Sequence, residues 1–170
     1  MTTPHRKSGA PWGVAIAVAL IVAASACRPA ERFVAANAEV VHDAATDLDW
    51  TRRDHDEALP WDAADRWCRE LALGGRDDWR LPEIGELQTL YDANRDEPCG
   101  DRRCRVDPVI RTRGPYVWSA TARGVGTRFY FDLGYANALS PTVTPELVRR
   151  VLCVRGTWDG AATTPADPGA

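Results

Sequence analysis

Cysteines are the residues of this 170-residue chain whose type and spacing point most directly to chemistry. One of the five, Cys27, lies near the N-terminus, and the other four are Cys68, Cys99, Cys104 and Cys153. Cys99 and Cys104 belong to the segment PCGDRRC, where a proline and a glycine favour a turn that brings them together. Four cysteines allow three pairings, but a local bond between these two leaves Cys68 to join Cys153. We therefore expect two disulfides, provided that the protein is exported.

The surroundings of these cysteines disfavour a metal site or a catalytic thiol. Zinc sites favour close pairs such as C-x-x-C, whereas the local spacing here is C-x4-C. After residue 26 the chain has only two histidines, His42 and His55, and neither is near a cysteine in the sequence. An exported free thiol is also readily oxidised. We expect no metal, no cofactor and no catalytic cysteine.

The first 26 residues predict the export that disulfides require. Arg6 and Lys7 precede an apolar run at 14–26, and no acidic residue occurs before Glu31. A helix of 13 residues spans about 20 Å, which is less than the roughly 30 Å of a bilayer core. The run is therefore typical of a signal peptide rather than of a membrane span.

The signal ends in Ala24-Ser25-Ala26-Cys27, which resembles a bacterial lipobox. On this interpretation Cys27 is lipidated and anchors the protein to an envelope membrane, at its periplasmic face or at the cell surface. Ala24 stands where leucine is usual, so ordinary signal cleavage with Cys27 as a bystander is the alternative. We expect a signal at 1–26, a tether at 27–32, one domain at 33–155 and a disordered tail at 156–170.

Hydrophobic patterns within 33–155 predict a compact α+β domain. Apolar residues follow helical spacing between Pro60 and the glycines at 74–75, at Ala64, Trp67, Cys68 and Leu71. Cys68 therefore faces the core. A second helix is predicted at 83–94, directly after Pro82. Strands are predicted at 40–42, 48–50, 116–122, 127–133 and 147–155, with an irregular charged segment at 95–115.

Five blocks in this order resemble the Lcl C-terminal domain, a bacterial family of largely unknown function found in secreted proteins and lipoproteins. They are VVHDAATDLDWTRR, residues 61–68, GGRDDWRLPEIGELQTL, YVWSAT and VRRVLCVRG, and the resemblance covers 33–155. It implies a C-type-lectin-like domain, related to formylglycine-generating enzymes, with two helices packed on short antiparallel sheets. In such folds a disulfide joins a helix to a late strand, and Cys68 and Cys153 match those positions.

The family's hallmark is a Trp-Arg-Leu-Pro step before a helix, here Trp79-Arg80-Leu81-Pro82. These residues have a structural interpretation of their own. Trp79 and Leu81 bury large apolar areas, and Pro82 sets the backbone for helix entry. Arg80 has five donors for loop carbonyls or a carboxylate. We therefore expect the step to stabilise the fold rather than to bind a ligand.

Arginines in the variable segment are the candidate ligand-binding residues, namely Arg102, Arg103, Arg105, Arg111 and Arg113. Guanidinium groups suit sulfated or carboxylated glycans, and the resemblance adds that the family's namesake is an adhesin of such polymers. The opposing observation is that six arginines at 95–113 accompany four acids, a net charge of only +2. Such mixed charges are also typical of a solvated loop.

Composition and motifs disfavour several other functions. The chain has 21 basic and 24 acidic residues, a net charge of -3, which argues against a nucleic-acid partner. Ser119 and Ser140 have no histidine close in the sequence, and calcium-site motifs of carbohydrate-binding C-type lectins are absent. We expect a non-catalytic binding or adhesion module whose partner is an anionic glycan or an envelope protein. The alternative is an envelope enzyme, or an accessory subunit, on a formylglycine-generating-enzyme-like scaffold.

Overall fold

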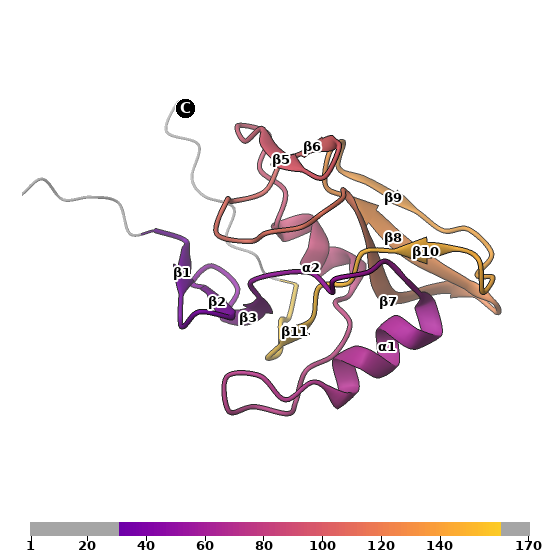
Figure 1. Cartoon of the computed structure of the whole chain (residues 1–170), viewed down its shortest axis with the longest axis horizontal. Helices are drawn as coiled ribbons and strands as arrows, with labels where there is room; N and C mark the ends of the chain where they lie inside the picture. The colour runs from indigo at the N-terminus through magenta and orange to yellow at the C-terminus, as the bar shows by residue number, and fades with distance from the viewer. Residues whose placement is uncertain (1–30, 161–170) are drawn as a thin grey trace, which may run out of the picture. The chain divides into compact units, whose positions relative to one another are not determined.

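The N-terminal part of the domain forms an antiparallel sheet with one strand from the C-terminal part. The computed structural model describes residues 31–160, shown in Figure 1. The sheet has the order β1 (Phe33–Ala35), β2 (Val40–Asp43), β3 (Leu48–Thr51) and β11 (Val154–Arg155). The strands predicted at 40–42 and 48–50 are confirmed, and β1 is an additional edge strand. Val41, Trp50 and Val154 project into the core, and each is 0% exposed.

Helix α1 (Trp61–Glu70) is covalently tied to the segment that leads into β11. Ala64 and Cys68 form its buried face, as the helical spacing predicted. The Cys68–Cys153 disulfide is present, with 5.6 Å between the two Cα atoms, so this predicted pairing is confirmed. The residues before α1 form β4 (Leu59–Pro60), which pairs with β10 (Val148–Arg149).

Helix α2 (Ile84–Thr89) is shorter than the segment predicted at 83–94. Its N-terminus has a capping box, in which Glu83 and Glu86 each accept from the other's backbone amide. Beyond Thr89 the chain leaves the helical path, because the Asp92 amide donates to the carbonyl of Arg105 instead of to a helical carbonyl. Leu90 is nevertheless buried, as its place in the predicted apolar stripe required.

A three-stranded antiparallel sheet lies between the two helices. Its strands are β7 (Tyr116–Gly124), β8 (Thr127–Asp132) and β9 (Asn137–Leu139), in that order. Val117 packs in the same core cluster as Leu87 of α2, whereas Trp118 packs in the same cluster as Cys68 of α1. Because neighbouring strand residues point to opposite faces, the two helices cover opposite faces of this sheet. Strand β9 was not predicted.

The late segment predicted as one strand at 147–155 is two short strands, β10 and β11, which belong to different sheets. Residues 150–153 connect them, and 151–153 are buried. The segment 95–115, predicted to be irregular, contains a hairpin of β5 (Glu97–Cys99) and β6 (Arg102–Cys104). The Cys99–Cys104 disulfide closes this hairpin, so the second predicted pairing is also confirmed.

The described part of the chain extends past the predicted end of the domain. The segment from 156 was predicted to be a disordered tail, yet its first residues pack against the domain. The carbonyl of Gly156 accepts from Arg80 at 3.0 Å, and Trp158 packs on the core beside α2. A single aromatic residue among small polar ones was too weak a signal to predict this contact.

The signal, Cys27 and residues 161–170 lie outside the described residues. Within 31–160, no helix has the length and apolar character needed to cross a membrane. The described residues form an α+β domain with two helices, several short antiparallel sheets and two disulfides.

Candidate functional site

The Trp-Arg-Leu-Pro step is built into the fold. Trp79 and Leu81 are 2% and 1% exposed. Between them, the Arg80 guanidinium forms a two-pronged ion pair with Glu86 of α2, at 2.6 and 2.8 Å. The hydrogen bond to Glu86 raises the pKa of Arg80. These contacts support the structural interpretation of the step.

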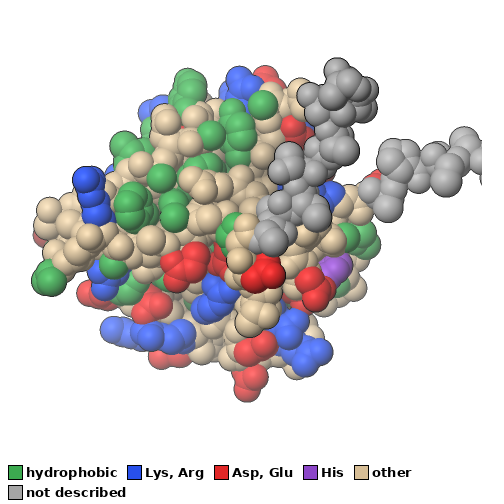
Figure 2. Space-filling view, turned by 180° about the vertical axis from the view of Figure 1, so that it is seen from behind, with side chains coloured by type: hydrophobic (Ala, Val, Ile, Leu, Met, Phe, Trp, Pro, Cys, Tyr) green, Lys and Arg blue, Asp and Glu red, His purple; other side chains and the backbone are tan. Residues whose placement is uncertain are grey.

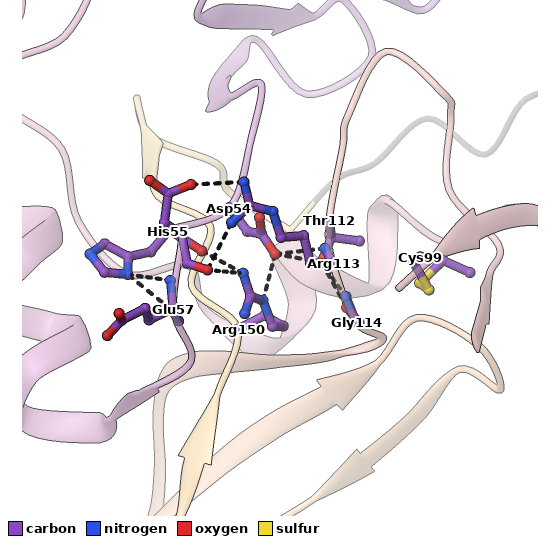
Figure 3. A network of polar contacts seen from close by, with 10 residues as sticks. Asp54, His55, Glu57, Cys99, Thr112, Arg113, Gly114 and Arg150 are labelled. Carbon is purple, nitrogen blue, oxygen red and sulfur yellow. Dashed lines mark hydrogen bonds and ion pairs between the residues drawn. A yellow bond between two sulfur atoms is a disulfide. The ribbon is translucent and has the colours of Figure 1, made fainter. Parts of the chain in front are cut away.

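A second buried charge pair joins three parts of the chain (Figure 3). Oδ2 of Asp54 accepts from Nε of Arg150 at 2.6 Å and from the backbone amide of Arg113 at 2.7 Å. The Thr112 hydroxyl donates to the same oxygen at 3.2 Å. Arg150 also donates to the carbonyl of His55. With the Asp54 carboxylate buried and paired, this network holds the strand β10 side of the domain against the loop at 112–114.

Three of the five candidate arginines line one hollow in the structure. Arg102, Arg103 and Arg105 line a hollow of about 340 Å³ on and beside β6, together with Tyr116 and Tyr135. Arg111 and Arg113 follow in the chain but do not line this hollow. Three of the candidate arginines thus share one hollow, whereas the backbone oxygen of Arg113 lies close to Gly100 in the turn of the β5–β6 hairpin. That these arginines bind a ligand stays a prediction.

Most of the predicted arginines already have partners within the domain. Arg103 pairs with Asp96 at 3.0 Å, and Arg113 pairs with Asp56 at 2.8 Å. The hydrogen bond from Arg103 lowers the pKa of the Asp96 carboxyl below its usual value. Arg105 donates to the carbonyl of Ala93 at 2.6 Å. Figure 2 shows the face of the molecule that is turned away in Figure 1, where basic and acidic side chains are interleaved over one part of the surface.

Arg102 differs because it lies over an aromatic ring instead of beside an acid, and two further arginines do the same. Arg102 lies 5.8 Å from the ring centre of Tyr116. The Arg149 guanidinium lies 4.3 Å from the ring centre of Tyr130 and 5.6 Å from that of Tyr116. Arg128 lies 4.3 Å from the ring centre of Trp61. We refer to these residues as the arginine–aromatic surface: Arg102, Arg128, Arg149, Trp61, Tyr116 and Tyr130.

The geometry of strands β7, β8 and β10 determines where the arginine–aromatic surface lies. Tyr116 and Trp118 lie on the face of β7 opposite to Val117, and the buried Trp118 is paired across the strands with Tyr130 of β8. The ring of Tyr130 meets that of Tyr116 edge to face at 5.7 Å. Strand β10 then brings Arg149 over these rings, and the rings hold its guanidinium by cation–π attraction of roughly 0.5–2 kcal/mol each.

The positive charges of this surface are not matched by acids. Among residues 31–160, no ion pair joins Arg102, Arg128 or Arg149 to a carboxylate. Nη1 of Arg128 and of Arg149 donates only to the carbonyl of the preceding residue. Their Nε atoms are buried and have no hydrogen-bond partner. Stacked guanidinium groups with unused donors are suited to sulfate, carboxylate or phosphate groups.

Sequence reasoning identified Arg102 but missed Arg128 and Arg149. The pattern of an arginine two residues before Tyr130 on a strand was visible, since both side chains point to one face. Arg149 had no comparable signal. Its position depends on the pairing of β10 with β4, which joins residues about ninety positions apart in the chain.

The described residues contain no group of three or more His, Cys, Asp or Glu side chains placed to hold a metal ion. All four cysteines of 31–160 lie in the two disulfides.

Comparison with known proteins gives one family. Residues 39–155 match the sequence model of the Lcl C-terminal domain. No curated protein matches the chain.

Proposed function

Because the chain belongs to the Lcl C-terminal domain family, we propose that it is an exported, lipid-anchored envelope protein with a non-catalytic binding module. The anchor is the lipid on Cys27, and the module binds anionic polymers through the arginine–aromatic surface. Two disulfides in the domain support export, because such bonds persist outside the reducing cytoplasm. Because the two disulfides use all four cysteines of the domain, none of these is a free catalytic thiol, which supports a non-catalytic role.

A C-type-lectin-like arrangement is part of this proposal. It is supported by the disulfide between helix α1 and the segment before β11, and by a small antiparallel sheet covered by helices on both faces. In such an arrangement the binding surface lies on strands and loops, while the helices and the disulfide stabilise the core.

The observation that carries the proposed function is the set of unmatched arginines stacked on aromatic rings. The chain as a whole has a net charge of -3, so its long-range field does not attract a polyanion. Binding therefore depends on a local group of guanidinium donors. Arg102, Arg128 and Arg149 supply such a group from three different strands, spread along a surface that suits an extended polymer.

Retention of the purified chain on a heparin column tests this. We expect the double variant Arg128→Gln with Arg149→Gln to elute at clearly lower salt than the wild type, because salt screens charge-dependent binding. The matched control is Arg66→Gln with Arg69→Gln, which removes the same charge from the exposed side of α1. Equal retention of the wild type and the Arg128/Arg149 variant would rule out this surface.

The anchor is tested separately by metabolic labelling with palmitate. We expect label on the wild-type chain and none on Cys27→Ser, because that cysteine is the proposed acylation site. Label that persists in Cys27→Ser would remove the lipoprotein part of the proposal and leave the binding module untouched.

A further inference from the structure

A large cavity lies away from the arginine–aromatic surface. It is a cleft with a volume of about 1070 Å³, between the chain around β1 and the two loops at 90–95 and 107–109. Small-molecule sites have volumes of roughly 300–1,000 Å³, so this cleft is large enough for a small ligand. Its lining shares no residue with the arginine–aromatic surface.

Arg52 is the cleft residue with unused hydrogen-bonding capacity. Its backbone is fixed, since its amide donates to Glu39 at 2.7 Å and its carbonyl accepts from Arg111 at 2.8 Å. Its side chain has no such partner: Nε is buried and makes no hydrogen bond. Among residues 31–160, no carboxylate forms an ion pair with Arg52. The buried Nε is out of reach of a ligand in the cleft, but the two terminal Nη groups are not buried and also have no partner within residues 31–160, so they can donate to an acceptor there.

The other cations of the cleft are already matched. Arg32 forms a two-pronged pair with Asp43, at 2.6 and 2.8 Å, and its guanidinium also covers the ring of Phe33. Arg95 pairs with Asp107 at 2.8 Å and with Asp92 at 3.4 Å. One guanidinium therefore remains for a ligand.

The charges and the walls of the cleft together define the ligand. Glu31, Asp92 and Asp107 also line the cleft, so a polyanion would be repelled while a single negative group can pair with Arg52. The walls around it are apolar, since Phe33, Tyr91 and Val109 pack against the core and line the cleft. A suitable ligand combines one anionic group with an apolar body.

We propose that this cleft binds small carboxylates with an apolar body, and that the Arg52 guanidinium holds the carboxylate while Phe33, Tyr91 and Val109 contact the rest. The Arg52 pair would be a charge-assisted hydrogen bond inside a partly water-excluded site, the setting in which such bonds are strongest. The proposal is independent of the polymer-binding function, because the two sites use different residues.

The test uses two probes that differ in one group, 3-phenylpropanoate and 3-phenylpropanamide, titrated into the ¹⁵N-labelled full chain. We expect 3-phenylpropanoate to shift the backbone amide signals around Arg52, Phe33 and Tyr91 in a saturable manner. The affinity of 3-phenylpropanamide should be at least about tenfold lower. Equal binding of the two probes, or no saturable binding of the carboxylate up to millimolar concentrations, would overturn the proposal.

Two variants locate the site. We expect Arg52→Gln to weaken binding of the carboxylate about tenfold and to abolish the preference over the amide. The matched control is Arg53→Gln, which removes the same charge from the adjacent position but does not line the cleft. Unchanged binding by a folded Arg52→Gln chain would contradict the assignment. The comparison of the two probes on the wild type decides the question even if that variant does not fold.

Discussion

The two disulfides allow a controlled test of what stabilises this domain, because they differ mainly in the length of chain that each one closes. Cys68 and Cys153 are separated by 85 positions, whereas Cys99 and Cys104 are separated by 5. All four side chains are buried, at 0%, 0%, 1% and 0% exposure. Replacing either pair by alanine therefore removes similar buried sulfur atoms but releases very different loops in the unfolded chain.

The expected magnitudes follow from the entropy of loop closure. Closing the long loop stabilises the folded domain by about 4.5 kcal/mol and closing the short loop by about 2 kcal/mol, a difference of about 2.5 kcal/mol. The total stability of a domain is commonly about 5–15 kcal/mol, so loss of the long disulfide is a large fraction of it. With a urea slope of about 2 kcal/mol per molar, the midpoint falls by about 2 M for the long pair and about 1 M for the short pair.

The assay is urea unfolding of the oxidised proteins, followed by tryptophan fluorescence. We expect the Cys68→Ala with Cys153→Ala variant to lose clearly more stability than the Cys99→Ala with Cys104→Ala variant. Equal losses, or a larger loss from the short pair, would refute the argument that the long disulfide acts mainly by restricting the unfolded chain. The urea slope of each variant must also equal that of the wild type, since a changed slope reports a changed unfolded state.

Three further outcomes are expected. Gly100→Ala should lower the urea midpoint more than Gly75→Ala, because both glycines have a positive φ but only at Gly100 would a Cβ meet a backbone oxygen, 2.3 Å away. An NMR titration should give Asp96 a pKa below the usual aspartate value, and Arg103→Gln should raise that pKa back towards it. The Arg103–Asp96 pair therefore stabilises the fold above the usual aspartate pKa, and this contribution is lost as the pH falls through the lowered pKa of Asp96. Trp158→Ala should cost about 2 kcal/mol in the same unfolding assay, since the indole packs on the core from outside the predicted domain boundary.

Residues with strong local signals were predicted well from the sequence. The helical spacing around Cys68, the turn between Cys99 and Cys104, and the strands at 40–42 and 48–50 all depend on neighbours within a few positions. The pairing of Cys68 with Cys153 followed by elimination, and the family resemblance agreed with it. In each of these cases the local pattern and the final fold favour the same structure.

Apart from the Cys68–Cys153 disulfide, features that depend on contacts between distant segments were not predicted. The second helix stops at Thr89 because the chain then pairs with the backbone near Arg105, and no local residue announces that contact. The same holds for the candidate site. Arg149 was hidden within a segment that looked like a single strand, and only the separation of β10 from β11 places it over the rings of Tyr116 and Tyr130.

The position of Arg149 also links the stability of the fold to the proposed binding surface. The next residue, Arg150, is fixed by the buried carboxylate of Asp54, and four positions after Arg149 the chain is held by the disulfide at Cys153. A guanidinium on a strand that is held at both of these nearby positions loses little freedom when it binds an anion, which favours binding. It follows that breaking the Asp54–Arg150 pair should weaken polymer binding even where the domain stays folded. A surface formed by a mobile loop would not respond in that way.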